Sequence, residues 1–317
     1  MLDITTIILT YNEEIHIRRC LENVCQISKK VFVVDSLSTD RTVEICQGFM
    51  NVDVVFHKYP GNQAEQFNWA LDNLKIDTAW VLRMDADEYL LPELVDELEK
   101  KIPSLPNDIN GIEFKRRHIF MGKWMKHGIY PAIIMRMFRT GYGRCEDRIM
   151  DEHIVISNGK SIVMDNDFCD HSLIDVTDFC KKHLNYARRE ATVVLYENYG
   201  LKEDPKNNFS DIDSNEHLGR QAEEKHLKKN QYNRMPLFWR SFAYFLFRYF
   251  LKGGILDGVA GFIFNFLQGW WYRFMVDVNI YDAISACGIK NAKHLNIAES
   301  DRTKLIEYIK NTWSISL

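Results

Sequence analysis

The sequence predicts an α/β fold in which helices pack on a parallel sheet of the doubly wound kind. Two observations predict it. Apolar runs rich in β-branched residues recur along the first part of the chain, and each is followed by a polar turn and a stretch with helical apolar spacing. Strands that alternate with helices in this way are typical of parallel sheets. The expected strands are residues 4–10, 31–34, 52–56 and 80–84, and the expected helices are residues 15–24, 41–49 and 64–74.

The boundaries of these elements follow from turn and capping residues. The first strand breaks at Tyr11 and leads into the first helix. The second strand ends at Asp35, and Asp40 stands where an N-cap of the next helix is expected. Pro60 lies in the polar segment before the third helix, and Trp80 opens the fourth strand. Further along, strands are expected at residues 111–119 and 133–139, and helices at residues 181–199 and 291–317.

Composition narrows the class of protein. The 317 residues allow one large or two small domains, and the net charge of -4 gives no reason to expect a nucleic-acid partner. The seven cysteines are scattered, odd in number and without a Cys-x-x-Cys pair, which predicts reduced thiols and a cytoplasmic location. The N-terminus shows neither a basic n-region nor a cleavage site, so we expect no signal peptide.

Polar clusters follow three of the predicted strands, at residues 10–13, 35–40 and 85–87. Ligands of doubly wound sheets bind at the carboxyl ends of the strands, so these clusters should meet in one crevice. Neither a Gly-x-Gly-x-x-Gly pattern nor a Gly-x-x-x-x-Gly-Lys pattern follows the first strand, which argues against a dinucleotide fingerprint or a phosphate loop.

The last of these clusters crowds three acids, Asp85, Asp87 and Glu88, at a strand end. Crowded carboxylates repel one another and need a cation or hydrogen-bond donors to stay ionised. A hard divalent ion meets this need, and Mg²⁺ is usually held by one or two carboxylates plus substrate phosphates. The alternative is a solvated acidic turn that caps the helix beginning near Pro92, and the residues alone leave both interpretations open.

Four ordered motifs resemble those of glycosyltransferase family 2. They are TYNEE at residues 10–14, VVDS with STDRT at residues 33–42, QFNWAL at residues 66–71 and WVL with DADE at residues 80–88. The branch most similar to this chain is that of the bacterial lipopolysaccharide core β-1,4-glucosyltransferases. The resemblance implies a GT-A fold, a Rossmann-like nucleotide-diphospho-sugar transferase sheet, with a C-terminal helical extension. It also implies a nucleotide-sugar donor and Mg²⁺ or Mn²⁺ held by the Asp-x-Asp acids.

The resemblance carries roles over to single residues. Asp85 would face the ribose and the metal, Asp87 would be the main metal ligand, and His171 would touch the diphosphate or the metal, or act as a structural hydrogen-bonding residue. Arg83 would contact the diphosphate or pair with an acid. The remaining nucleotide-sugar positions are Thr10, Tyr11 and Glu13 around the base, Asp35 at the base or ribose, and Gln66 and Asn68, which border the nucleotide or are helix surface amides.

Inverting transfer needs a base that removes the proton from the acceptor hydroxyl. Family members commonly have a His-Glu pair in the segment that here reads Asp151-Glu152. Glu152 matches the glutamate and is the first candidate, and Asp151 is the second. The alternative is that both acids pair with Arg144 or Arg148 as a surface network.

The domain organisation predicted from these patterns is a GT-A catalytic domain at residues 1–178 and a helical region at residues 179–317. After Pro236 the chain becomes rich in aromatic residues, with Arg240, Arg248 and Lys252 among them. This mixture favours an interfacial helical hairpin on the inner surface of the membrane. A helix pair that covers the sheet or a subunit interface in a homo-oligomer is the alternative.

The predicted function is a metal-dependent inverting glycosyltransferase that moves a hexose from a UDP-sugar to a cell-envelope glycan or a lipid-linked glycan. It would act in the cytoplasm or as a peripheral protein on the cytoplasmic face of the membrane. A nucleotidyltransferase on a similar sheet is one alternative, although it should carry a glycine-rich basic loop after the first strand. A non-catalytic peripheral membrane or assembly protein is the other.

Overall fold

The computed structural model describes residues 1–146, 152–201, 217–218, 228–229, 231–289 and 297–315. These residues form two compact units. The first is Met1–Leu173 together with a later segment that contains strand β12 (His217–Leu218), and the second begins at Ile174. The boundary predicted at residue 178 lies in the first turn of helix α5 (Val176–Tyr199).

Within the described residues, nine strands of the first unit form one sheet, in the order β3-β2-β1-β4-β8-β6-β11-β5 with β7 paired to β6. The strands are β1 (Leu2–Thr10), β2 (Ser28–Asp35), β3 (Val52–Phe56), β4 (Trp80–Asp85), β5 (Glu88–Leu90), β6 (Ile109–Phe120), β7 (Lys123–Trp124), β8 (Ala132–Arg139) and β11 (Lys160–His171). A small second sheet joins β12, β10 (Ile154–Ile156) and β9 (Gly143–Cys145).

The predicted α/β class is confirmed, but the sheet is mixed rather than wholly parallel. Strands β3, β2, β1 and β4 pair in parallel as expected. Beyond β4 the neighbour is β8, which runs antiparallel to β4 and to β6. The reason is topological, since antiparallel neighbours need only a short connection, and β6 returns into β8 without a crossover helix. The strands expected at residues 111–119 and 133–139 are β6 and β8.

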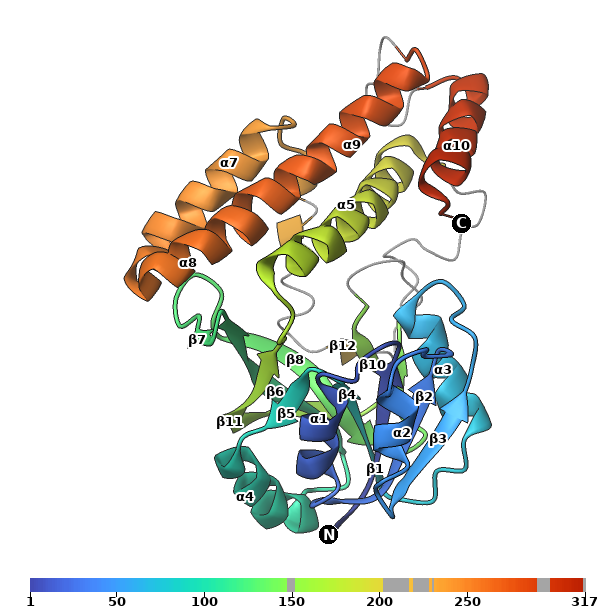
Figure 1. Cartoon of the computed structure of the whole chain (residues 1–317), viewed down its shortest axis with the longest axis vertical. Coiled ribbons are helices and arrows are strands. Elements are labelled where there is room, and N and C mark those ends of the chain that lie inside the picture. Colours follow the sequence, from blue (N-terminus) through green and yellow to red (C-terminus); the bar gives the residue numbers. More distant parts are fainter. Residues whose placement is uncertain (147–151, 202–216, 219–227, 230, 290–296, 316–317) are drawn as a thin grey trace. The chain divides into compact units, whose positions relative to one another are not determined.

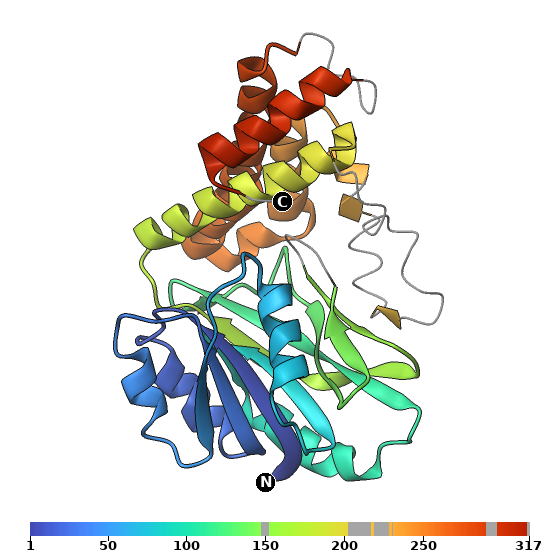
Figure 2. The same ribbon diagram turned by 90° about the vertical axis from the view of Figure 1, so that its right-hand side faces the viewer.

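Helices cover both faces of the sheet (Figures 1 and 2). On one face, α1 (Ile17–Val24), α2 (Thr42–Cys46) and α4 (Pro92–Lys101) pack on strand residues such as Ile8, and a 3₁₀ turn (Ile102–Ser104) follows α4. On the other face, α3 (Gln63–Asn73) packs on residues such as Ile7. Neighbouring residues of a strand point to opposite faces, so one strand serves both cores.

Helix limits follow the side chains that cap them. Asn62 accepts a hydrogen bond from the backbone N–H of Glu65 (2.6 Å) and so begins α3, and Pro92 opens α4. The helix expected at residues 41–49 is shorter than expected. Its first turn is fixed by the Asp40 carboxylate, which accepts from the backbone N–H of Thr42 (2.9 Å), and Gly48 follows its last turn.

The second unit is helical. It contains α5, α7 (Trp239–Leu246), a π-helical turn (Phe247–Leu251), a 3₁₀ turn (Gly254–Asp257), α8 (Gly258–Phe264), a second π-helical stretch (Asn265–Trp271), α9 (Tyr272–Ala286) and α10 (Glu299–Trp313). Its apolar core lies where α5, α9 and α10 meet, around residues such as Leu195, Ile280 and Leu305. Of the helices that the structure describes, none is by itself both long and apolar enough to cross a membrane. Trp239–Leu251 and Gly254–Ala286 meet that criterion only as a pair, bent by 71°.

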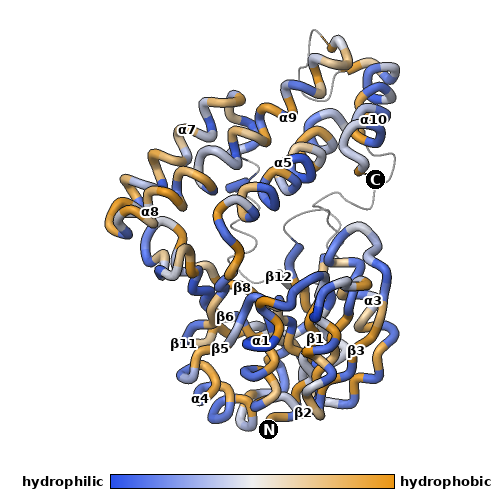
Figure 3. The backbone as a smooth tube through the Cα atoms, viewed as in Figure 1, coloured by the Kyte–Doolittle hydropathy of each residue, from blue (hydrophilic) through white to orange (hydrophobic). Residues whose placement is uncertain are grey.

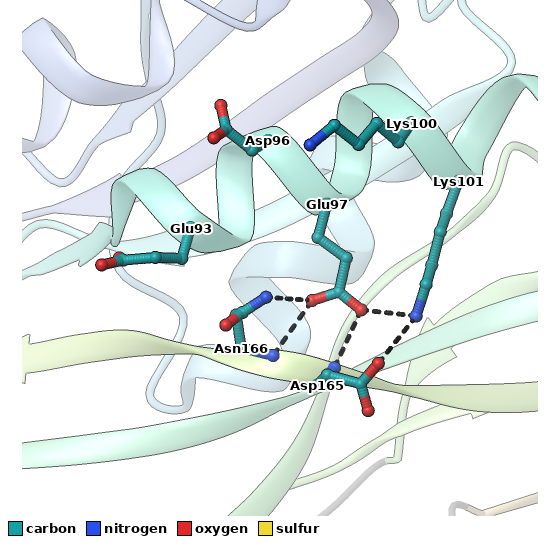
Figure 4. Close-up of a pocket in the computed structure, with 7 residues that line it drawn as sticks. All are labelled: Glu93, Asp96, Glu97, Lys100, Lys101, Asp165 and Asn166. Carbon is teal, nitrogen blue, oxygen red and sulfur yellow. Dashed lines mark hydrogen bonds and ion pairs between the residues drawn. The ribbon is translucent and has the colours of Figure 1, made fainter.

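An open depression of about 420 Å³ between α4 and β11 is lined by charged and amide side chains (Figure 4). The lining residues are Glu93, Asp96, Glu97, Lys100, Lys101, Asp165 and Asn166. The buried Glu97 carboxylate accepts from the backbone N–H groups of Asp165 (2.9 Å) and Asn166 (3.0 Å) and from the Lys101 ammonium (2.6 Å). Burial opposes the charge, but these donors outweigh it and lower the pKa of Glu97 to about 2. This carboxylate therefore ties α4 to the sheet.

We expect Glu97→Gln to lower the free energy of unfolding by about 2 kcal/mol at pH 7, because it removes a charge that several donors stabilise. The folded-state pKa lies below the unfolded-state value, so this contribution is present above about pH 4.5 and is lost as the pH falls toward 2. The gap between wild type and variant should narrow by roughly 1 kcal/mol between pH 7 and pH 4. Denaturant unfolding at both pH values measures it, with Glu99→Gln on the exposed side of α4 as control. A gap that widens toward acid would contradict this role.

Candidate active site

The ends of three parallel strands lie level with one another at one edge of the sheet. Thr10 stands opposite Asp35 across the β1–β2 pair, and Leu9 stands opposite Asp85 across the β1–β4 pair. The polar clusters after β1, β2 and β4 therefore start from the same edge, as the rule for ligand sites in such sheets predicts.

The Asp35 carboxylate organises the first two of these clusters. Its side chain is fully buried, and it accepts from Thr10 Oγ1 (3.0 Å), Ser38 N (2.8 Å) and Ser38 Oγ (2.5 Å). Asn12, in the left-handed region at φ 54°, donates its N–H to Ser38 Oγ (2.8 Å). These bonds fix the turns after β1 and β2 against each other and leave the Tyr11 ring 59% exposed beside them.

Glu13 links the first turn to the end of β11. The Nδ1 atom of His16 lies 2.6 Å from Glu13 Oε2, and the other ring nitrogen of His16 accepts from the backbone N–H of Leu173 (2.8 Å). Since that nitrogen accepts, the proton of a neutral ring lies on Nδ1 and is donated to Glu13. His16 thereby orients Glu13 and ties it to the backbone of Leu173.

One guanidinium contacts two of the three acids in the turn after β4. Arg136 of β8 donates from Nη2 to Asp85 Oδ2 (3.0 Å) and to Glu88 Oε1, and the backbone N–H of Asp85 donates to Glu88 Oε2 (2.9 Å). Arg136 is 6% exposed and Glu88 2%. Burial raises the pKa of Glu88, and the neighbouring charge of Asp85 acts in the same direction against Arg136. The sequence predicts that this acidic cluster needs a cation. For Asp85 and Glu88, that cation is an arginine.

Asp87 and His171 are held next to each other by Arg19. Arg19 donates to the backbone carbonyls of Asp87 (3.1 Å) and His171 (2.5 Å), and its Nη1 lies 3.1 Å from His171 Nδ1. The backbone N–H of His171 also donates to the Asp87 carbonyl (3.0 Å). Burial lowers the pKa of His171, and the charge of Arg19 acts in the same direction, which favours the neutral ring that binds metals.

In the described part of the chain, no three His, Cys, Asp or Glu side chains form a group that could hold a metal ion. Asp85, Asp87 and His171 thus do not make a cage of protein ligands. A hard divalent ion is commonly held by one or two carboxylates together with substrate phosphates. The adjacent Asp87 and His171 fit an ion shared with a diphosphate, and they do not fit an ion held by the protein alone.

Of three predicted nucleotide contacts, Gln66 and Arg83 are buried and Asn68 is partly exposed. Gln66 is 1% exposed, and its amide bonds the ring of His57 (2.6 Å) and the hydroxyl of Ser36 (3.2 Å). Asn68 exchanges two hydrogen bonds of 2.9 Å with the backbone of Cys145.

The third of these contacts, Arg83, is 4% exposed and donates to Cys145 Sγ (2.9 Å) and Gln63 Oε1 (3.3 Å). All three residues, Gln66, Asn68 and Arg83, therefore have positioning roles in this structure. Their contact with a nucleotide stays a prediction.

Glu152 is partly buried close to this interior group. Burial opposes the charge of Arg83, but anionic neighbours that include Glu152 leave the pKa of Arg83 above its ordinary value. Arg144 uses both terminal nitrogens on Asp72 (2.7 and 3.0 Å), which counts against Arg144 as the partner of the candidate bases. Asp151 and Arg148 lie outside the described residues.

Sequence reasoning missed Arg19, His16 and Arg136, although each fixes a predicted residue. Arg19 and Arg136 are far along the chain from the residues they fix, with 51 positions separating Arg136 from Asp85, whereas His16 is three positions from Glu13. A weak signal existed in the run IIMRMFR, where an arginine interrupts an otherwise apolar strand. A charged residue within such a strand needs a partner, and an acid at the end of a neighbouring strand is the natural one.

We expect Arg136→Met to lower the free energy of unfolding by roughly 3 kcal/mol, because it leaves the buried Glu88 and the partly exposed Asp85 without their cation. Adding Glu88→Gln should restore a large part of the loss, since one of the opposed charges is then removed. Arg144→Met breaks an exposed pair and serves as the control, with an expected cost below about 1 kcal/mol. Equal losses in the two single variants, measured by denaturant unfolding, would show that Arg136 does not balance the acids.

Comparison with known proteins agrees with this geometry. The family model described as Glycosyl transferase family 2 matches residues 5–168. An uncharacterized glycosyltransferase of Rickettsia bellii (strain RML369-C) is 40% identical over 96 residues, which are 30% of this chain and 31% of that protein. The lipopolysaccharide core biosynthesis glycosyltransferase LpsC of Rhizobium meliloti (strain 1021) is 26% identical over 152 residues, 45% of this chain and 53% of that protein. The matches to the rickettsial relatives span about a third of their length.

Solved structures are also similar. A mannosyltransferase from Pyrobaculum calidifontis, in complex with GDP-Man and Mn²⁺, is 15% identical, with a TM-score of 0.47 over 88% of this chain and 87% of that one. Residues 1–349 of S. aureus TarS are 15% identical, with a TM-score of 0.39 over 91% and 92%. The predicted α/β sheet with a helical C-terminal region is what the structure of this chain shows. Because the family model covers more than half of the 317 residues, this chain belongs to glycosyltransferase family 2.

Proposed function

We propose that this protein is an inverting glycosyltransferase that moves a hexose from a UDP-sugar, with the help of a divalent metal, to a hydroxyl of a cell-envelope or lipid-linked glycan. The observation that carries the proposal is the edge of the sheet at which Thr10 stands opposite Asp35 and Leu9 opposite Asp85, with Asp87 beside His171. Family membership supports the reaction class.

The nucleotide would lie over the turns after β1 and β2. Tyr11 offers an exposed ring there, and Asp35 and Glu13 hold the surrounding backbone through hydrogen bonds. Hydrogen bonds from fixed side chains position a nucleoside where a glycine-rich phosphate loop is missing. The sequence from Thr10 to Glu14 lacks such a loop, which disfavours the nucleotidyltransferase alternative.

The diphosphate would lie at the acidic turn. Asp87 and His171 would hold Mg²⁺ or Mn²⁺, which when bound supplies positive charge to the departing diphosphate. Arg136 prevents Asp85 and Glu88 from adding two uncompensated negative charges where the diphosphate of the donor must sit. Arg19 holds the backbone of Asp87 and His171 in place by donating hydrogen bonds to their carbonyl groups.

Inversion follows from a single displacement at the anomeric carbon. The acceptor oxygen forms the new bond while the bond to the diphosphate oxygen breaks, and the acceptor proton passes to a carboxylate. Glu152 is our first candidate for that base and Asp151 the second. Glu152 lies close enough to the buried Arg83 to contribute to the raised pKa of that guanidinium, against the effect of burial.

The acceptor class is inferred from relatives. The name of the Rhizobium meliloti relative assigns it to lipopolysaccharide core biosynthesis, and we infer a related cell-envelope acceptor for this chain. With such an acceptor, we infer that the enzyme acts in the cytoplasm or as a peripheral protein on the cytoplasmic face of the membrane. A non-catalytic scaffold would bind neither metal nor donor, and the next experiment separates the two.

We expect a UDP-sugar to raise the midpoint of thermal unfolding by roughly 5 °C or more at saturating concentration, and only with Mn²⁺ or Mg²⁺ present, because selective binding stabilises the folded state. A panel of nucleotide sugars would identify the donor. Asp87→Asn should abolish the metal-dependent part of the shift, whereas Asp96→Asn, which changes an exposed carboxylate on α4, should leave it intact. A metal-independent shift, or a full shift in Asp87→Asn, would overturn the metal assignment.

We expect Glu152→Gln to reduce hydrolysis of the preferred UDP-sugar at least about 100-fold, because the amide cannot accept the proton of the attacking oxygen. The donor-induced thermal shift should be unchanged in this variant, which separates a catalytic loss from a binding loss. Asp151→Asn is the matched comparison. Full turnover in Glu152→Gln together with loss in Asp151→Asn would reverse the order of the two candidates.

A further inference from the structure

Residues 239–277, here called the aromatic hairpin, fold back on themselves in the second unit. Arg240 pairs with Asp277, the rings of Phe242 and Trp270 lie 5.3 Å apart, and Arg248 bonds Asn265. These contacts join residues progressively closer to the turn at Gly253, so the two helical arms run antiparallel.

The polar groups of the aromatic hairpin point inward. Arg240 (1% exposed) donates from Nε to Asp277 Oδ1 at 2.7 Å, and Asp277 is fully buried. Arg248 (3% exposed) donates to Asn265 Oδ1 (2.9 Å) and to Gln268 Oε1 (2.7 Å). Across the two arms, Arg240 thus meets an opposite charge, and Arg248 meets two amide oxygens.

The outward side of the aromatic hairpin is almost entirely apolar. Between residues 239 and 277, Lys252 is the one charged or polar residue whose side chain is exposed. Large apolar side chains that are 36% to 79% exposed recur every three or four residues along both arms. They are Trp239, Phe242, Leu246, Phe247, Phe250, Leu251, Ile255, Leu256, Val259, Phe262, Phe266 and Phe274. Figure 3 shows the segment around α8 as predominantly hydrophobic.

This polarity is the reverse of that of α10 in the same unit. Helix α10 buries Leu305, Ile309 and Trp313, while its exposed side carries polar residues such as Lys304 and Glu307. Helix α10 shows that this helical unit has room to bury apolar side chains. The exposed apolar side chains of the hairpin are therefore not explained by a lack of interior space.

The size and chemistry of the exposed surface indicate its partner. At roughly 100 Å² for each half-exposed side chain, the twelve residues present on the order of 1,000 Å² of apolar surface. Soluble monomers rarely expose patches beyond roughly 600 Å². Protein interfaces carry a polar rim and hydrogen-bonding groups, whereas a surface with one lysine and no exposed acid suits hydrocarbon bordered by anionic headgroups.

We propose that the aromatic hairpin embeds its outer apolar surface in one leaflet of a lipid bilayer, with Lys252 reaching the anionic headgroups. Lysine side chains extend in this way from apolar surroundings to the interface. The inference does not depend on the proposed transfer reaction, because it rests on the second unit alone.

The interior of the hairpin is suited to that environment. A Cβ added at Gly254 would lie 2.7 Å from Asn265 Nδ2, and one added at Gly261 would lie 2.7 Å from the Gly254 carbonyl. Glycines that allow such close approach are typical of helices packed within membranes, where packing rather than the hydrophobic effect holds helices together. The arginines Arg240 and Arg248 are buried inside the hairpin. Lys252 is therefore the one charged side chain that is exposed on its outer side.

Flotation of the full-length chain with lipid vesicles tests the proposal. We expect the wild type to float with vesicles of phosphatidylcholine and phosphatidylglycerol, and the double variant Leu256→Glu with Val259→Glu to bind at least tenfold more weakly. Thr303→Glu with Asn311→Glu adds the same charge to the exposed side of α10 and should bind as the wild type does. Lys252→Gln should weaken binding to anionic vesicles more than binding to neutral ones.

Two further readings make the outcome decisive. The donor-induced thermal shift and the far-ultraviolet circular dichroism spectrum should be unchanged in Leu256→Glu with Val259→Glu, which excludes unfolding as the cause of lost flotation. A wild type that stays with the soluble fraction, or equal flotation of wild type and double variant, would overturn the proposal. Loss of a dimer in the same variant, without vesicle binding by the wild type, would assign the surface to a second copy of the chain instead.

Discussion

The contact of Arg136 with Asp85 and Glu88 is the constraint on which the rest of the first unit depends. Two carboxylates at the end of a buried strand repel each other, and this guanidinium contacts both and reduces their repulsion. Arg136 comes from β8, which lies antiparallel beside β4. The departure from a wholly parallel sheet is therefore what brings the balancing charge to the acidic edge.

Because Arg136 contacts two of the acids, the acids of this turn lie in two different electrostatic environments. Asp85 and Glu88 are committed to Arg136, while Asp87 stands beside His171 under the control of Arg19. Neighbouring carboxylates of one short sequence thus acquire different electrostatic settings. This separation lets one strand end contain a structural ion pair next to residues suited to a metal shared with a ligand.

Much of the fold and part of the site could be predicted from the sequence. The four parallel strands follow from their β-branched runs, and Thr10, Asp35 and Asp85 lie level because strand ends share an edge. The charge argument for the acidic turn used only acids that are neighbours in the sequence. It could not include Arg136, which lies 51 positions further along the chain than Asp85. The burial of Gln66 depends likewise on tertiary contacts that no local pattern encodes.

The aromatic hairpin shows the same limit in another form. Its composition predicts an interfacial hairpin, but the basic residues Arg240 and Arg248, expected at the headgroups, lie inside and bind Asp277 and Asn265. Polar groups of each arm bond to polar groups of the other, and these interior contacts hold the two arms together. The outer side chains take no part in these contacts. Substitutions on the outer side can therefore change what the hairpin binds without removing what holds it together.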